Sequence, residues 1–402
     1  MGLTRELTAW AHLAWQDWQF RRRQPKGWQQ MRLTNVPVAP VEELLMRWAG
    51  GSVWRGGPQA MPWHRPCAAL HHYRGDERTD DPARTLQNAD QWPMQGDRLF
   101  WCGPIVNHFG HQLGEFGGRL LMASLDPRPG QLLFLHPEGD RDLEDLLPWQ
   151  QAWVEFLNPS GKPVLIRGGS FRARELVVVP QQQRLGCAPT PRHLLALTAR
   201  GRSLPQQPLN DVIVLSRAQF AKGQDKASLR GSIAGEAALD AWMASQGARI
   251  VYPEQLPFNE QLELLHNARR LIVAEGSALH ALELIGRQAQ KEVVVLARRS
   301  LWPGMDRPLR SRFPRLIWLD AVRELHWLEP SNPRVKGIAR LDWVPVLRAL
   351  CRQFNWCANE DTVSELTAAA NAQLTHLSKT LPMQSQICES HHQRQAIRAG
   401  GW

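Results

Sequence analysis

The second half of the chain alternates short apolar runs with segments of helical spacing. Continuous apolar runs predict strands at 211–215, 249–252, 270–274, 292–296 and 315–319. Apolar positions at helical spacing between them predict helices at 234–246, 257–269 and 278–286. Strands that are apolar on both faces and alternate with helices are typical of a parallel sheet covered on both sides. We therefore expect an α/β, Rossmann-like domain over residues 210–325.

The first half shows a weaker pattern of the same kind. Bounded apolar runs predict strands at 132–135, 164–166 and 176–179, and helical spacing predicts helices at 108–124 and 141–157. These elements predict a second α/β domain over residues 101–200. Four prolines between 185 and 210 predict a linker between the two domains.

The two ends of the chain carry less regular patterns. We interpret residues 1–100 as an extension with an amphipathic helix at 5–20, a basic end at Arg21–Arg23, and mostly loop from residue 50 onward. Residues 326–402 predict a helical and polar extension, with helices at 341–355 and 362–378.

Composition narrows the class of protein. The chain has 402 residues, of which 43% are hydrophobic, which excludes a disordered or fibrous protein. The net charge of +10 favours acidic partners, such as nucleotide phosphates, anionic polysaccharide, nucleic acid or a membrane face. No nucleic-acid partner is expected, because the arginines follow no nucleic-acid-binding motif. Six scattered cysteines and no long apolar run predict a cytoplasmic protein, for which peripheral contact with the inner membrane face stays open.

Polar residues follow three of the predicted strands directly. Ser216-Arg217, Glu254 and Glu275-Gly276-Ser277 stand at such ends, where open parallel sheets bind ligands. Gly276 permits a tight turn and Ser277 occupies an N-cap position, so the amides of 277–279 predict a pyrophosphate site. The alternative is an ordinary turn between a strand and a helix.

Arginines near these ends could neutralise phosphate. Arg217 and Arg230 offer guanidinium groups that match phosphate oxygens, although Arg217 could equally pair with Glu236 at the surface. Arg298 and Arg299 begin a basic loop after the strand at 292–296. That loop either meets an anionic ligand or is simply solvated.

One helix face carries a row of ionisable residues. His111, Glu115 and Arg119 are spaced i, i+4 and i+8, so the acid lies between two bases. Such a row can orient an imidazole as the general base for an acceptor hydroxyl, or it can be a surface salt-bridge ladder. His108 and His111 lack a third ligand, so we expect no metal site.

The string NHFGHQLGEFGGRL at 107–120 resembles the N-terminal motif of glycosyltransferase family 61, in its branch of bacterial capsular polysaccharide biosynthesis proteins. The second half is similar to the family in an ordered set of shorter motifs: Ser216-Arg217, Arg230, Gly235-Glu236, Pro253-Glu254, Gln261, Ala268-Arg269 and Glu275–His280. The resemblance extends over about 103–320.

The resemblance implies a GT-B-like fold, in which two Rossmann-like domains face each other and the C-terminal one holds the donor. It implies an inverting, metal-independent glycosyltransferase that needs no cofactor. The donor would be a nucleotide-sugar, taken as UDP-linked, and the acceptor a surface polysaccharide or glycolipid. We assign His111, Glu115 and Arg217 as catalytic. The substrate-binding assignments are Arg119, Ser216, Arg230, Glu236, Glu254, Gln261, Glu275, Gly276, Ser277, Ala278 and His280.

Some positions depart from the family pattern. Eukaryotic members have His-Gly-Ala where this chain has Glu275-Gly276-Ser277, and Gly235 replaces the Asn of the usual Asn-Glu pair. These departures motivate an alternative, namely a non-catalytic glycan- or nucleotide-binding protein on the same scaffold.

Overall fold

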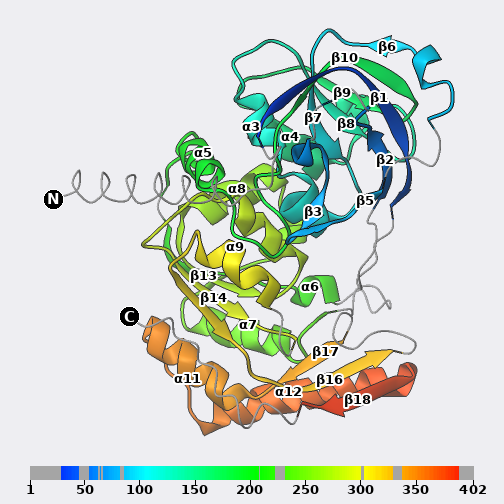
Figure 1. The fold of residues 1–402 in the computed structure, drawn as a ribbon. Helices are drawn as coiled ribbons and strands as arrows, with labels where there is room; N and C mark the ends of the chain where they lie inside the picture. Colours follow the sequence, from blue (N-terminus) through cyan, green and yellow to red (C-terminus); the bar gives the residue numbers. More distant parts are fainter. Residues whose placement is uncertain are drawn as a thin grey trace. The chain divides into compact units, whose positions relative to one another are not determined.

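The computed structural model describes residues 29–44, 54–61, 64, 67–81, 86–207, 209–221, 231–299, 303–328 and 337–388. The predicted helix at 5–20, the arginines that follow it, and Arg230 lie outside these residues. The chain divides into two compact units (Figure 1). Unit 1 contains residues 1–204, 283–287 and 304–311, and unit 2 contains residues 205–282, 288–303 and 312–402.

Within its described residues, unit 1 is built on an eight-stranded sheet of order β5-β2-β1-β10-β7-β8-β9, with β6 paired to β10. The strands are β1 (Met31–Leu44), β2 (Trp54–Pro58), β5 (Asp80–Asp81), β6 (Met94–Gln95), β7 (Leu99–Pro104), β8 (Gln131–Leu135), β9 (Val164–Arg167) and β10 (Phe171–Val178). Strands β10, β7, β8 and β9 run parallel, and β1 pairs antiparallel with β10. The predicted strands at 132–135, 164–166 and 176–179 are therefore confirmed.

Strand β1 corrects the interpretation of residues 1–100 as a loop-rich extension. It pairs with β10 from Met31 to Val38, and β2 continues the same sheet. Prolines disfavour a regular strand, but the register shift between Ala39 and Glu43 accommodates Pro40 at a bulge.

The helices of unit 1 are short. They are η1 (Ala68–Leu70), η2 (Ala89–Gln91), α2 (Phe109–His111), the π-helix η3 (Gln112–Phe116), α3 (Leu120–Ser124), η4 (Leu143–Asp145), α4 (Pro148–Leu157), α5 (Pro191–Gly201) and α9 (Asp306–Arg310). Helix α5 occupies much of the predicted linker. Pro191 is its first residue and Thr190 its N-cap, so these residues begin a helix rather than a flexible connection.

The predicted helix at 108–124 is interrupted by the π-turn η3. The Gly117 amide donates to the Gln112 carbonyl at 2.8 Å, five residues back. A Cβ at Gly117 would lie 2.7 Å from Trp153, and one at Gly118 would lie 2.6 Å from the Gln183 carbonyl oxygen. Both glycines therefore permit close packing where the helix widens, and such π-turns are frequent at functional sites.

Unit 2 contains a five-stranded parallel sheet of order β12-β11-β13-β14-β15. Its strands are β11 (Leu209–Leu215), β12 (Arg249–Val251), β13 (Ala268–Ala274), β14 (Glu292–Leu296) and β15 (Arg315–Leu319). All five match predicted strands, which confirms an α/β fold with parallel sheets. In chain order the strands lie 2-1-3-4-5, so the strand order reverses between β11 and β13.

Between these strands, unit 2 contains the helices α6 (Ala218–Ala221), α7 (Glu236–Ser245), η5 (Pro253–Gln255), α8 (Phe258–Asn267), η6 (Ser277–Leu284) and η7 (Pro303–Met305). The last two residues of η6 and the last two of η7 belong to unit 1. Helices α7 and α8 confirm two predicted helices. Segment η6 is a 3₁₀-helix, so the predicted helix at 278–286 is wrong in type, and Ser277 is its first residue rather than an N-cap.

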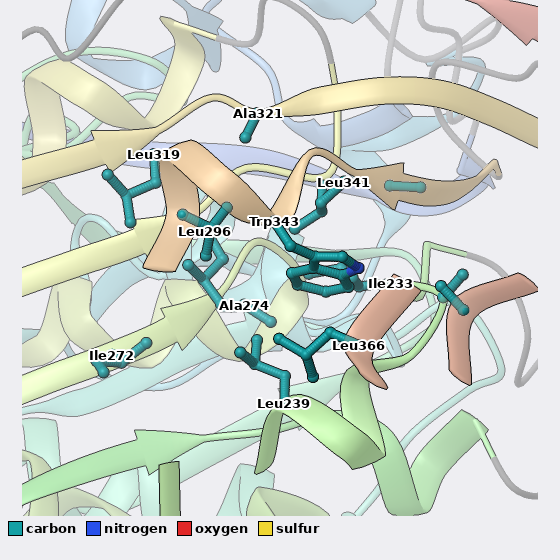
Figure 2. Packing of buried hydrophobic residues seen from close by; sticks show 14 of the residues in the cluster. Ile233, Leu239, Ile272, Ala274, Leu296, Leu319, Ala321, Leu341, Trp343 and Leu366 are labelled. Atoms are coloured by element: carbon teal, nitrogen blue, oxygen red, sulfur yellow. The ribbon is translucent and has the colours of Figure 1, made fainter. Parts of the chain in front are cut away.

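Residues 322–328 and 338–387 belong to the core of unit 2. They form β16 (Val322–Leu328), β17 (Ile338–Leu341), α11 (Trp343–Phe354), α12 (Glu360–Thr380) and β18 (Met383–Ile387). Figure 2 shows Trp343 among side chains of α7, β13 and α12, represented by Leu239, Ala274 and Leu366. These elements bury one face of the parallel sheet, and so they are more than a polar extension. No helix among the described residues is long and apolar enough to cross a membrane.

Candidate functional site

Three arginines gather at the carboxyl ends of β11, β13 and β14, where the strand order of unit 2 reverses. Arg217 follows β11, and Arg298 and Arg299 follow β14. Glu275, which follows β13 and is 1% exposed, holds the latter two. Its carboxylate accepts the Arg298 amide at 3.1 Å and Arg299 Nε at 2.8 Å, and its carbonyl accepts Arg298 Nε at 2.7 Å. Glu275 therefore fixes the direction of two guanidinium groups.

Arg217 lies against the turn that Gly276 makes. A Cβ at 276 would be 2.7 Å from Arg217 Nη1 and 3.1 Å from its Cδ. The guanidinium carbon lies 5.2 Å from the centre of the exposed Phe220 ring. Only a residue without a side chain at 276 lets the guanidinium approach the backbone this closely.

Burial makes these cations costly in the absence of an anion. It lowers the pKa of Arg217, and it lowers the pKa of Arg298 to about 9. Partly desolvated guanidinium groups at a strand-order reversal are the arrangement expected of a site for a phosphorylated ligand.

A pair of buried acids supports the segment that carries Arg217. Glu236 Oε1 accepts the Arg217 amide at 2.8 Å, and Ser216 Oγ donates to Asp240 Oδ2 at 2.6 Å. Burial raises the pKa of Glu236 and raises that of Asp240 to about 7, with Glu236 adding to the latter effect. Ser216 and Glu236 therefore support the segment that carries Arg217, and their contact with substrate stays a prediction.

A second cluster lies in unit 1 around Glu115, whose side chain is fully buried. His111 Nδ1 lies 2.7 Å from Oε2 and His72 Nε2 lies 3.0 Å from Oε1. Arg74 Nε and Nη2 donate to the two oxygens at 2.6 and 3.0 Å. Burial alone would raise the pKa of Glu115, but hydrogen bonds from His111, His72 and Arg74 hold it far below its usual range.

The ionised carboxylate decides which nitrogen of each imidazole carries hydrogen. Because a carboxylate only accepts, His111 must donate from Nδ1, and the neutral imidazole with hydrogen on Nδ1 has its lone pair on Nε2. The His108 ring lies 4.5 Å from the His111 ring, and its Nδ1 accepts the His111 amide. An imidazole oriented by a buried carboxylate in this way is suited to accept a proton from a hydroxyl group.

Residues 109–293 match the family model described as Glycosyltransferase 61. The protein is a glycosyltransferase. No curated protein matches the chain. The matched segment covers a little under half of the enzyme. It includes Glu115, His111, Arg217 and Glu275, whereas the hairpin with His72 and Arg74 lies before it.

Other predicted site residues of the enzyme are distributed unevenly. Gly276 is buried, Glu254 and Ser277 are exposed, and Ala278 and His280 are half-buried. Leu279 N–H donates to the Gly276 carbonyl at 3.1 Å, so the Ser277 and Ala278 amides precede the first bond of η6.

Two predicted substrate-binding residues of the glycosyltransferase hold the backbone in place. Gln261 Nε2 donates to the carbonyls of Pro253 and Leu256 at 2.7 and 2.9 Å. Arg119, 1% exposed, donates to three backbone carbonyls, two of which are those of Ala69 and His71. Burial lowers the pKa of Arg119 to about 10. These bonds give Gln261 and Arg119 a structural role, whereas their contact with substrate stays a prediction.

His72 and Arg74 were missed because their region was interpreted as loop. A signal was present, since the sequence Tyr73-Arg74-Gly75-Asp76-Glu77-Arg78 carries a two-residue turn typical of a hairpin. The structure forms that hairpin from β3 (Tyr73–Arg74) and β4 (Glu77–Arg78). Within the described residues, no group of three or more His, Cys, Asp or Glu side chains could hold a metal ion. A metal-independent reaction stays a prediction.

Proposed function

We propose that the protein is an inverting, metal-independent glycosyltransferase, which transfers a sugar from a UDP-linked or similar nucleotide-sugar to a surface polysaccharide or glycolipid. The observation that carries the donor assignment is the set of guanidinium groups around the Glu275-Gly276 turn. Their position at the strand-order reversal supports a nucleotide ligand.

The donor half of the proposal belongs to unit 2. Arg217 and Arg298 would contact the diphosphate, and the amides of Ser277 and Ala278 would donate to its oxygens. Arg299 is paired with Glu275 and keeps that turn in place. The exposed carboxylate of Glu254 and the half-buried His280 would contact hydroxyl groups of the ribose or sugar.

The acceptor half belongs to unit 1. His111 Nε2 would take the proton of the acceptor hydroxyl as its oxygen attacks the anomeric carbon. The bond from that carbon to the phosphate oxygen breaks, and its electron pair stays with the nucleoside diphosphate. Glu115 would stabilise the imidazolium that forms. Attack opposite the leaving group inverts the anomeric configuration.

We propose further that the two units are the two domains of a GT-B enzyme of the bacterial capsular branch. The motif at 107–120 and the parallel sheet of unit 2 support this assignment. The basic net charge agrees with an anionic glycan or with a cytoplasmic place beside the inner membrane face, and no nucleic-acid partner is proposed.

The shift in melting temperature with UDP-, GDP- and CMP-sugars tests the donor site. Release of free nucleoside diphosphate, or of nucleoside monophosphate from CMP-sugars, tests turnover. At least one donor should raise the melting temperature of the wild type, and Arg217→Ala should abolish the shift. Arg249→Ala removes an exposed arginine from the amino end of β12 and should leave the shift unchanged. A panel without any shift refutes the donor site, and binding without turnover favours the non-catalytic alternative.

A further inference from the structure

The hairpin β3–β4 reaches the centre of the Glu115 cluster from outside the segment that matches the family model. His72 and Arg74 are 43 and 41 residues before Glu115 in the chain, yet they make three hydrogen bonds to its carboxylate. The cluster is therefore incomplete without the N-terminal region of the enzyme.

Buried side chains fix the hairpin at this place. Gln181, 1% exposed, accepts the Tyr73 amide at 2.9 Å, and its Nε2 donates to the Tyr73 carbonyl at 3.3 Å and to the Glu115 carbonyl at 3.1 Å. Arg119 donates to the carbonyl of His71. The side-chain amide of Gln181 thus joins the backbone of the hairpin directly to the backbone of Glu115.

The fork of Arg74 matches the carboxylate in both charge and shape. Its two donors meet separate oxygens, so the carboxylate plane cannot rotate without breaking at least one bond. His72 fixes one of the same oxygens from the other side, and burial lowers the pKa of this histidine. With the carboxylate held in this plane, Oε2 points at His111 Nδ1.

We propose that Arg74 is a positioning residue, which acts through Glu115 to hold His111 in the tautomer with hydrogen on Nδ1. The role of that tautomer as general base rests on the proposed function, but the tautomer itself does not. The other ionisable groups around the cluster are His108 beside His111, Arg119 on the same chain segment, and Asp80 with His71 and Arg78 around the hairpin.

Nitrogen-15 NMR of histidine-labelled full-length protein tests the proposal, with His111 assigned by the loss of its signals in His111→Asn. In the wild type at neutral pH, Nδ1 of His111 should show the shift of a protonated nitrogen and Nε2 that of an unprotonated one. Arg74→Met should move both shifts toward the average of the two tautomers. Arg74→Lys retains the positive charge but not the fork, and should restore part of the wild-type signature.

Kinetics provide a second readout. Arg74→Met should lower kcat at least about tenfold, inside the 10²- to 10⁴-fold that a general base contributes, while KM for the donor stays unchanged. The matched control is Arg78→Met, which removes a guanidinium from the same hairpin but from a side chain paired with Asp80. It should leave both the His111 shifts and kcat as in the wild type.

Several results would overturn the proposal. One is a wild-type His111 with hydrogen on Nε2, which needs no variant to fold. Another is an unchanged tautomer in Arg74→Met or a failure of Arg74→Lys to restore it. Failure of the proposed function looks different: the wild type would show no transfer, or His111→Asn would retain full transfer activity, while the tautomer still responded to Arg74.

Discussion

Replacing Gly276 by alanine tests the donor site at its tightest point. The new Cβ would lie 2.7 Å from Arg217 Nη1 and 3.1 Å from Cδ. Ordinary contacts of a Cβ lie at 3.4–4 Å, so the guanidinium must retreat by about 0.7 Å or turn away. The atoms that must move belong to the end of a flexible side chain, and 276 requires no positive φ. We therefore expect the fold to lose less than about 1 kcal/mol.

Binding of the nucleotide should respond far more strongly. A displacement of this size takes a donor out of the narrow distance range of a good hydrogen bond. Loss of one hydrogen bond to a charged group costs about 1.5–3 kcal/mol, which corresponds to a roughly 10- to 150-fold weaker Kd. Isothermal titration calorimetry with the nucleoside diphosphate of the best donor measures this change. Gly169→Ala is the control, since a Cβ there meets nothing within 4 Å.

A double-mutant cycle decides whether the effect passes through Arg217. If it does, Gly276→Ala should weaken binding in the wild type and have little further effect in an Arg217→Ala background. Equal losses in both backgrounds would refute the reasoning, because the added methyl group would then act on the ligand or on the turn itself.

Three further substitutions test the supporting interactions. Burial raises the pKa of Asp240 to about 7. Between about pH 4 and pH 7, the folded protein therefore holds a proton on Asp240 that the unfolded chain has released. The contribution of Asp240 to the free energy of unfolding falls as the pH rises through that window. Asp240→Asn should therefore gain about 2–3 kcal/mol over the wild type between pH 5 and pH 8 in urea unfolding, and a constant difference would contradict this. Glu115→Gln should cost about 3–5 kcal/mol because Arg74 loses its buried partner, and an unchanged melting temperature would contradict that. Arg119→Met should cost roughly 2–4 kcal/mol through three unsatisfied carbonyls without altering donor binding, and a weaker Kd would place Arg119 at the substrate site.

The sheet of unit 2 could be predicted from sequence because its signals are local. Each strand is a continuous apolar run with a polar residue at its end, so the places of Arg217 and Glu275 at the carboxyl edge followed directly. The type of helix after Gly276 did not follow. Apolar spacing in an eight-residue segment fits both 3.6 and 3.0 residues per turn, and the Gly276 turn decides between them through the bond from Leu279.

Long-range contacts account for what the sequence did not predict. Strand β1 carries Pro37, Pro40 and Asn35, the last with φ of 52°, and each of these is locally a turn signal. Its pairing with β10, more than a hundred residues later, overrides them. In the same way, Arg74 shows no signal for its partner, because the carboxylate that it binds is 41 residues away.

If the donor binds as proposed, the charges around the Glu275-Gly276 turn favour the transition state over the bound donor. Glu275 engages Arg298 and Arg299, while Glu236, whose pKa is raised by burial, accepts the Arg217 amide. Burial of Arg217 and Arg298 strengthens any further electrostatic interaction that these guanidinium groups make. As the bond to the anomeric carbon breaks, the diphosphate gains negative charge, and its attraction to these fixed cations grows. Because this gain arises during the reaction and not on binding, it lowers the barrier rather than only tightening the complex.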